Sequence, residues 1–137
     1  MILSQKSFKN TPSVLAVDDN LDNIYLLSYV LESMNIKCYG VNDSSSVFDL
    51  AMNKAPKLIL LDIVMPEMSG FDVLRQLKSN MFTRDIPIIA VTGLVSLYCQ
   101  AKIKSAGFDD YICKPFVLEE LEAKIAQHLL CSVQVAA

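Results

Sequence analysis

Short apolar segments alternate along the chain with longer segments in which apolar residues recur at helical spacing. The short segments are typical of β-strands, and they span residues 13–17, 36–41, 58–61, 87–91 and 109–113. The segments of helical spacing span residues 21–34, 45–53, 71–79, 94–106 and 117–130. Strands and helices that alternate through short connections form parallel sheets with helices on both faces. The pattern therefore predicts a single doubly wound α/β domain.

The third predicted strand is hydrophobic throughout and ends at a charged residue. Residues 58–61 form a continuous apolar run, as expected for a strand buried on both faces, and Asp62 follows directly. Ligands of open α/β folds bind outside the carboxyl ends of the strands. Asp62 is therefore a candidate for chemistry, although an isolated Asp at this place can equally serve only to end a strand.

Polar residues at the ends of three other predicted strands favour the chemical interpretation. Asp18 and Asp19 follow the first strand, Thr92 follows the fourth, and Lys114 follows the fifth. Parallel strands end at the same edge of a sheet, so these side chains are expected near Asp62. Neighbouring carboxylates repel each other unless a cation joins them, and oxygen ligands suit Mg²⁺. A hydroxyl and an ammonium in addition suit a phosphoryl group, because both can hold its oxygens.

Composition narrows the class of protein. The 137 residues are enough for one domain with a single core, and 53% hydrophobic with 20% charged residues is ordinary for a globular protein. The formal net charge of −3, without a run of Lys or Arg, argues against nucleic-acid binding. We expect neither a membrane span nor a signal peptide. The four cysteines are scattered without a CxxC pair, which indicates a reduced, cytoplasmic protein.

Four motifs, in order and at the predicted strand ends, resemble the receiver domain of bacterial response regulators. They are VDDN at residues 17–20, LLDIVMPEMSG at 60–70, VTG at 91–93 and YICKPF at 111–116. The resemblance covers about residues 13–130, with residues 1–12 expected to be a loose N-terminal segment and residues 131–137 a short C-terminal tail. It implies a flavodoxin-like fold with five strands in the order 2-1-3-4-5. Whether the chain acts alone or is part of a larger sensor kinase stays open.

The resemblance also implies a function and the residues that perform it. The chain would be a phosphoacceptor of two-component signalling, with a sensor histidine kinase or a histidine phosphotransfer protein as its partner. Asp62 would take the phosphoryl group from a phosphohistidine of that partner. Asp18, Asp19, Asp62 and the backbone carbonyl of Val64 would bind Mg²⁺.

The remaining motif residues would complete the site and transmit its state. Thr92 and Lys114 would contact the phosphoryl oxygens, and the resemblance implies a cis peptide bond between Lys114 and Pro115. Tyr111 would be the switch residue that turns inward on phosphorylation. Its movement would change one face of the domain, formed by the helix over 94–106, the strand over 109–113 and the helix over 117–130.

The helix over residues 94–106 is a candidate contact surface. Its predicted buried stripe consists of Val95, Cys99, Ile103 and Ala106, which leaves Leu97 and Tyr98 toward solvent. We expect this apolar pair to contact a partner protein or a second copy of the chain on phosphorylation. His128, the single histidine, lies near the predicted end of the last helix, where a cation suits the helix dipole.

Other functions of an Asp at a strand end fit the sequence less well. A phosphatase of the haloacid dehalogenase type needs a second Asp two residues after the nucleophile, where this chain has Val64. A flavin carrier needs a hydroxyl-rich loop after the first strand, where this chain has Asp18 and Asp19. The chain would therefore not be an enzyme beyond its own phosphorylation and slow dephosphorylation. The resemblance places Val64 and Leu94 beside the approach of water to the phosphoryl group. Both are apolar and cannot orient a water molecule, so loss of the phosphoryl group would be slow.

Overall fold

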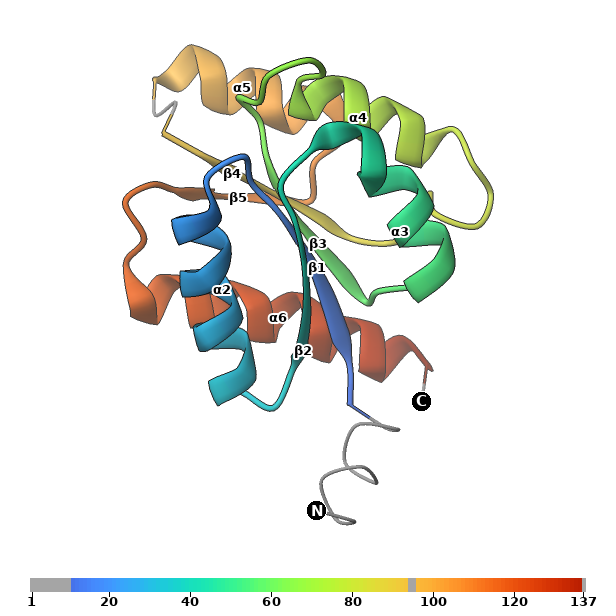
Figure 1. Cartoon of the computed structure of the whole chain (residues 1–137), viewed down its shortest axis with the longest axis vertical. Coiled ribbons are helices and arrows are strands. Elements are labelled where there is room, and N and C mark those ends of the chain that lie inside the picture. The colour runs from blue at the N-terminus through green and yellow to red at the C-terminus, as the bar shows by residue number, and fades with distance from the viewer. Residues whose placement is uncertain (1–10, 94–95, 137) are drawn as a thin grey trace.

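Five parallel strands form one sheet in the order β2-β1-β3-β4-β5 (Figure 1). The computed structural model describes residues 11–93 and 96–136, without the side chains of residues 98 and 130–136. The strands are β1 (Ser13–Val17), β2 (Lys37–Val41), β3 (Leu58–Asp62), β4 (Ile88–Thr92) and β5 (Asp110–Cys113). This is the doubly wound, flavodoxin-like order that the sequence predicts.

Helices cover both faces of the sheet. They are α2 (Leu21–Ser33), α3 (Val47–Lys54), α4 (Gly70–Lys78), α5 (Leu97–Ala106) and α6 (Leu118–Ala136), with a short 3₁₀ turn, η1 (Ser44–Ser46), before α3. Figure 1 shows α2 and α6 on one face and α3, α4 and α5 on the other. Within the described residues, no helix combines the length and the hydrophobicity that crossing a membrane requires.

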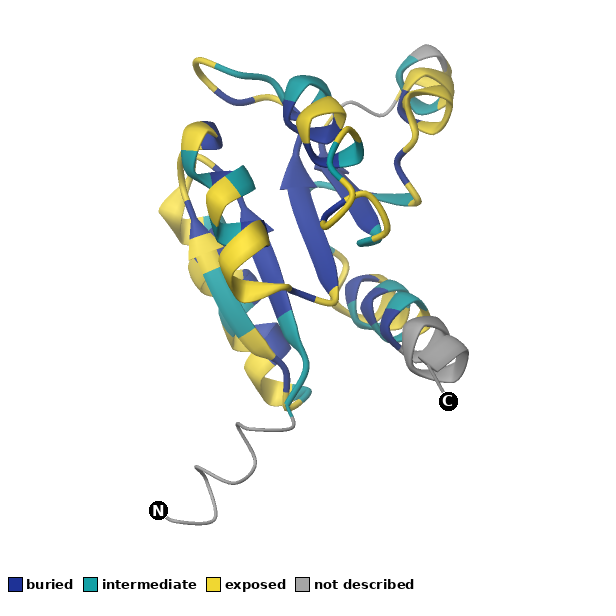
Figure 2. Ribbon diagram, turned by 90° about the vertical axis from the view of Figure 1, so that its right-hand side faces the viewer, coloured by how far each residue is buried: buried dark blue, intermediate teal, exposed yellow. Residues whose placement is uncertain are grey.

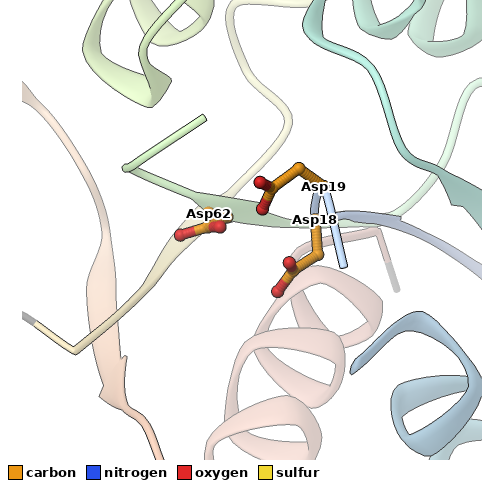
Figure 3. Close-up of side chains that lie close together, drawn as sticks. All are labelled: Asp18, Asp19 and Asp62. Carbon is orange, nitrogen blue, oxygen red and sulfur yellow. The ribbon is translucent and has the colours of Figure 1, made fainter. Parts of the chain in front are cut away.

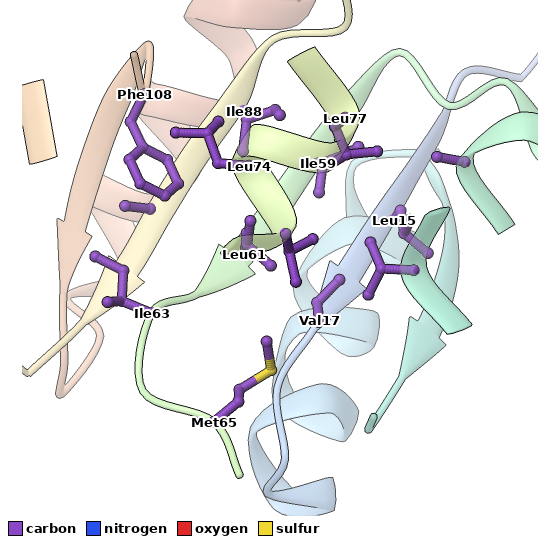
Figure 4. Close-up of a cluster of buried hydrophobic side chains, with 14 of the residues drawn as sticks. Leu15, Val17, Ile59, Leu61, Ile63, Met65, Leu74, Leu77, Ile88 and Phe108 are labelled. Atoms are coloured by element: carbon purple, nitrogen blue, oxygen red, sulfur yellow. The ribbon is translucent and has the colours of Figure 1, made fainter. Parts of the chain in front are cut away.

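The core consists of two hydrophobic layers, one on each side of the sheet. Successive residues of a strand point to opposite faces, so Ile59 and Leu61 of β3 join one layer while Leu58 and Leu60 join the other. All residues of β3 and β4 are buried, and Figure 2 shows these strands enclosed between partly exposed helices. Figure 4 shows the layer under α3, α4 and α5. Burial on both faces explains why the strands appear in the sequence as continuous apolar runs.

Capping residues begin the helices close to the strand ends and so keep the loops short. The side chains of Asn20, Ser69 and Ser96 each accept a hydrogen bond from a backbone N–H in the first turn of α2, α4 and α5. Gly107 ends α5 with a left-handed backbone, φ 113°, which a glycine adopts without strain. These loops carry the residues that follow β1, β3 and β4.

Three expectations about the helices need correction. The last helix does not end at residue 130 but continues to Ala136, since no Gly or Pro interrupts residues 131–136. His128 is therefore not close to the helix end, and its Nε2 lies 3.1 Å from Oδ2 of Asp110 instead. Ala106 is exposed rather than buried, because it is the last residue of α5. Val95 and Leu94 lie outside the described residues, as does the side chain of Tyr98.

The first prediction concerns the loop between β3 and α4, where Gly70 packs against backbone. A Cβ at Gly70 would lie 2.5 Å from the carbonyl oxygen of Asp62 and 2.7 Å from Cα of Ile63. Backbone atoms cannot yield as a flexible side chain can, so we expect Gly70→Ala to lower the free energy of unfolding by about 1–3 kcal/mol. Gly93→Ala is the matched control, since a Cβ there meets no atom within 4 Å.

Urea denaturation of both variants measures these free energies. We expect Gly93→Ala to stay within about 0.5 kcal/mol of the wild type. A Gly70→Ala variant as stable as Gly93→Ala would contradict the close contact between α4 and the end of β3.

Candidate functional site

The carboxylates that follow β1 and end β3 gather at the carboxyl edge of the sheet. Carboxylate oxygens of Asp18, Asp19 and Asp62 all lie within 4.8 Å of one another (Figure 3). The pairing of β1 with β3 brings this about, because Val17 lies opposite Leu61 and the acidic residues come next in both strands. The structure thus brings Asp62 together with the adjacent pair Asp18 and Asp19, which is far from it in the sequence.

Asp18 is buried, and both of its carboxylate oxygens have polar partners. Its side chain is 1% exposed, and Oδ1 accepts a hydrogen bond from the backbone N–H of Asn20 at 2.9 Å. Oδ2 accepts from Nδ2 of Asn23 at 3.2 Å and lies 2.8 Å from Nζ of Lys114. Buried carboxylates need such partners, and these contacts hold the Asp18 side chain in place at the edge of the sheet.

Asp62 ends the central strand and is also buried, with 4% of its surface exposed. Its Oδ1 accepts a hydrogen bond from the backbone N–H of Val64 at 3.3 Å, and its Oδ2 lies 3.4 Å from Nζ of Lys114. Burial raises the pKa of Asp62 to about 6, since the ammonium of Lys114 opposes this effect only in part and the charge of Asp18 adds to it. The Asp62 carboxylate is therefore predominantly ionised at neutral pH, although its burial disfavours the charged form.

Lys114 joins the two buried carboxylates. It follows β5 and precedes Pro115, with which it forms the expected cis peptide bond. Burial alone would lower the pKa of Lys114, but its hydrogen bond to Asp18 and the charge of Asp62 outweigh burial and raise it. The ammonium thus stays protonated and offsets one of the two buried negative charges.

The other residues implied by the sequence lie around this group. Asp19 is exposed, whereas Thr92 is fully buried at the end of β4, and its backbone carbonyl accepts from the N–H of Lys114 at 2.8 Å. Tyr111 lies in β5, half-buried against the core layer under α5. The side chain of Val64 is 62% exposed. All four lie at the carboxyl edge or on the strand that leads to it.

The donor set fits a hard divalent cation. It consists of oxygen ligands alone, and the three carboxylates outnumber the single ammonium that lies between two of them. Oxygen-only sets with several carboxylates suit Mg²⁺ and Ca²⁺ rather than softer metals. Chemically, the edge offers an ionised carboxylate as a nucleophile and a fixed positive charge beside it.

Asn23 is a contact of the site that the sequence reasoning missed. It lies in the first turn of α2 and donates to Oδ2 of Asp18. A signal was present, because a helix that begins directly after Asp18 and Asp19 turns its first polar residues back toward them.

Comparison with known proteins agrees with the resemblance seen in the sequence motifs. The family model of the response regulator receiver domain matches residues 14–126. The polar-differentiation response regulator DivK of Brucella ovis is 34% identical over 119 residues, which cover 87% of this chain and 97% of that protein.

Solved structures agree with the fold. The receiver domain of the sensor histidine kinase PA1611 from Pseudomonas aeruginosa, solved with a magnesium ion coordinated in its active-site cleft, superimposes with a TM-score of 0.80 at 26% identity. The match covers 87% of this chain and 98% of that one. The chemotaxis protein CheY4 of Vibrio cholerae superimposes with a TM-score of 0.81 at 24% identity, over 87% of this chain and 99% of that one.

The raised pKa of Asp62 predicts a pH-dependent stability. Ionisation of Asp62 destabilises the folded chain once the pH exceeds the ordinary Asp value of about 4, and the full effect is reached above about 6. In metal-free buffer at about pH 7, Asp62→Asn removes the destabilising charge and should raise the melting temperature. Below about pH 4, where Asp62 is protonated in both folded and unfolded chains, the gain should disappear. Thermal unfolding of both proteins across this range measures it, and a difference independent of pH would contradict the assignment.

Proposed function

Because the chain belongs to the family of response regulator receiver domains, we propose that Asp62 accepts a phosphoryl group from a phosphohistidine, with Mg²⁺ bound beside it. Receiver domains are signalling proteins, and the donor would be a sensor histidine kinase or a histidine phosphotransfer protein. The observation that carries the proposal is the grouping of Asp62 with Asp18, Asp19 and the Lys114 ammonium at the end of the central strand.

In the proposed reaction, an oxygen of Asp62 forms a bond to phosphorus while the bond from phosphorus to the donor histidine nitrogen breaks. The electron pair of the broken bond stays on that nitrogen. Asp18, Asp19, Asp62 and the backbone carbonyl of Val64 would hold Mg²⁺, whose charge would offset that of the incoming phosphoryl group. Lys114 keeps its proton, since its pKa is raised, and would turn its ammonium toward the phosphoryl oxygens.

The transmission of the signal is the finer part of the proposal. The hydroxyl of Thr92 would bind a phosphoryl oxygen, and Tyr111 would then turn inward. Thr92 and Tyr111 lie on neighbouring strands, where Ala90 is opposite Tyr111 and Thr92 is two residues further along. Phosphorylation would thus bias a two-state rearrangement that begins at the sheet edge.

This rearrangement would change the surface formed by α5, β5 and α6, which would then contact a protein partner or a second copy of the chain. A groove of about 430 Å³ lies along α5 and β5, with Leu97, Ile103, Phe108 and Tyr111 among its lining residues. Leu97 is 82% exposed at its rim.

We also propose a cytoplasmic location, supported by the free thiols of Cys38, Cys99 and Cys113, which fractionation of cells would test.

The proposed site predicts that Asp62 is the single residue of the chain that accepts a phosphoryl group. Incubation with Mg²⁺ and acetyl phosphate or phosphoramidate should add one phosphoryl group to the wild-type chain, because both compounds donate without a protein partner. Intact mass spectrometry measures the addition. Asp62→Asn should abolish it, while Asp49→Asn, which changes an exposed carboxylate on α3, should leave it unchanged. Labelling retained in Asp62→Asn would refute the assignment.

The lifetime of the phosphorylated chain should depend on Val64. This residue is two positions after Asp62, and its apolar side chain offers no hydrogen bond to an attacking water. Because Val64 is 62% exposed, the prediction rests on that missing hydrogen bond rather than on closure of the site. Val64→Asn should speed the loss of the phosphoryl group about tenfold, the effect of one positioning hydrogen bond.

Decay of the purified phosphorylated protein in Mg²⁺ measures this rate. Val64→Ala is the matched control, since it removes apolar bulk without adding a hydrogen-bonding group. Equal decay rates for the Asn and Ala variants would show that orientation of water by this side chain is not the cause.

Leu97 tests the contact surface. A charge at this position should weaken phosphorylation-dependent association, because apolar contacts at an interface are lost when a carboxylate must be desolvated. Light scattering and partner pull-downs, with and without acetyl phosphate, would compare the wild type with Leu97→Glu. Phe82→Glu is the control, since Phe82 is 71% exposed but lies between α4 and β4, outside the surface. Identical responses of wild type and Leu97→Glu would argue against this surface.

A further inference from the structure

One lysine of α6 makes four contacts around the residue proposed as the switch. Nζ of Lys124 lies 3.1 Å from Oδ1 of Asp110 and 3.8 Å from Oε1 of Glu120. It also donates a hydrogen bond to the backbone carbonyl of Tyr111 and lies 4.8 Å from the centroid of the Tyr111 ring. A single ammonium therefore holds both the backbone and the ring of Tyr111.

Asp110 fixes this lysine in place and is itself fixed on both sides. Its Oδ1 accepts from the backbone N–H of Tyr111 at 2.8 Å in addition to Lys124, while Oδ2 lies 3.1 Å from Nε2 of His128. Burial by itself would raise the pKa of Asp110, but the contacts with His128, Tyr111 and Lys124 hold it below its ordinary value. The carboxylate is thus ionised and available to anchor the ammonium.

The group is shielded from water, unlike an ordinary surface ion pair. The side chains of Lys124, Asp110 and His128 are only 23%, 22% and 15% exposed. Partial burial strengthens the attraction between a cation and an aromatic ring, because water competes less for the ammonium. The lysine and the histidine are four residues apart on α6, so one helix face contacts the beginning of β5.

We propose that Lys124 is a positioning residue of the switch, which holds the Tyr111 ring in its present orientation and thereby sets how readily the ring turns. This inference rests on the proposed function, in which Tyr111 moves toward the end of β4 after phosphorylation. A ring that moves in that direction leaves the ammonium of Lys124. The contacts of Lys124 with Asp110 and with the Tyr111 carbonyl do not involve the ring and can persist.

The contact between the ammonium and the ring therefore favours the orientation seen in this structure over the turned one. Loss of the ammonium should enrich the turned orientation about two- to fivefold, the change in equilibrium expected for one such contact. A ligand that binds the turned state then needs a correspondingly lower concentration, because a larger fraction of the chain is competent to bind it.

Two uncharged variants and two controls test this role. Lys124→Met removes the charge and keeps an apolar stem, while Lys124→Gln can still donate to the Tyr111 carbonyl and covers the case that Lys124→Met does not fold. Lys124→Arg retains the charge. Lys54→Met removes a similar contact elsewhere, since Nζ of Lys54 lies 5.2 Å from the centroid of the Tyr39 ring.

The readout is the NMR signal of the Tyr111 ring in tyrosine-labelled protein, assigned with Tyr111→Phe and titrated with beryllofluoride in the presence of Mg²⁺. Beryllofluoride is an analogue of a phosphoryl group. In Lys124→Met and Lys124→Gln, the signal should move toward its beryllofluoride-bound position before any addition. The midpoint of the titration should fall about two- to fivefold. Lys124→Arg and Lys54→Met should behave as the wild type.

The outcomes separate this inference from the function on which it rests. A wild-type Tyr111 signal that responds to beryllofluoride, with unchanged signal and midpoint in the uncharged variants, would overturn the role of Lys124 alone. A wild-type signal that does not respond would overturn both the tyrosine switch and the role of Lys124. Phosphorylation of Asp62, measured by mass, would stand in either case.

Discussion

Two buried carboxylates at the ends of paired strands, with one ammonium between them, form the constraint on which the site depends. Asp18 and Asp62 are 1% and 4% exposed, and Nζ of Lys114 lies 2.8 Å from one and 3.4 Å from the other. Buried charges destabilise a fold unless partners compensate them, and one ammonium compensates only one carboxylate. With Asp19 beside them, the excess of negative charge accounts for the fit to a divalent cation. Burial is the main cause of the raised pKa of Asp62, and the charge of Asp18 adds to it.

The parallel sheet makes this arrangement possible and connects it to the surface. Strands buried on both faces place their carboxyl ends in register at one edge. The last strand, β5, has only four residues, with Asp110 at its beginning and Lys114 directly after its end. The proposed site therefore holds one end of β5 through Lys114, while α6 holds the other through Lys124 and His128. In the proposed function, a change at Lys114 reaches Tyr111 within this one short strand.

The sequence predicts the fold and the grouping of acidic residues because both follow from patterns along the chain. Apolar runs reveal the buried strands, and a parallel sheet brings Asp18, Asp19 and Asp62 together whatever the side-chain details. The contacts of Lys124 were beyond such reasoning, since they depend on how far a helix is rotated against the sheet. His128 was misinterpreted for a related reason, because α6 was expected to end at residue 130 and the partner Asp110 is 18 residues away.

The central claim is that Asp62 is the residue that becomes phosphorylated, and chemical trapping tests it most directly. Borohydride reduces an acyl phosphate at an aspartate to homoserine and leaves free carboxylates unchanged. Peptide mapping of the protein after treatment with acetyl phosphate, Mg²⁺ and borohydride should find homoserine at position 62. Homoserine at position 18 or 19, or at no position in a protein that has gained phosphoryl mass, would contradict the account.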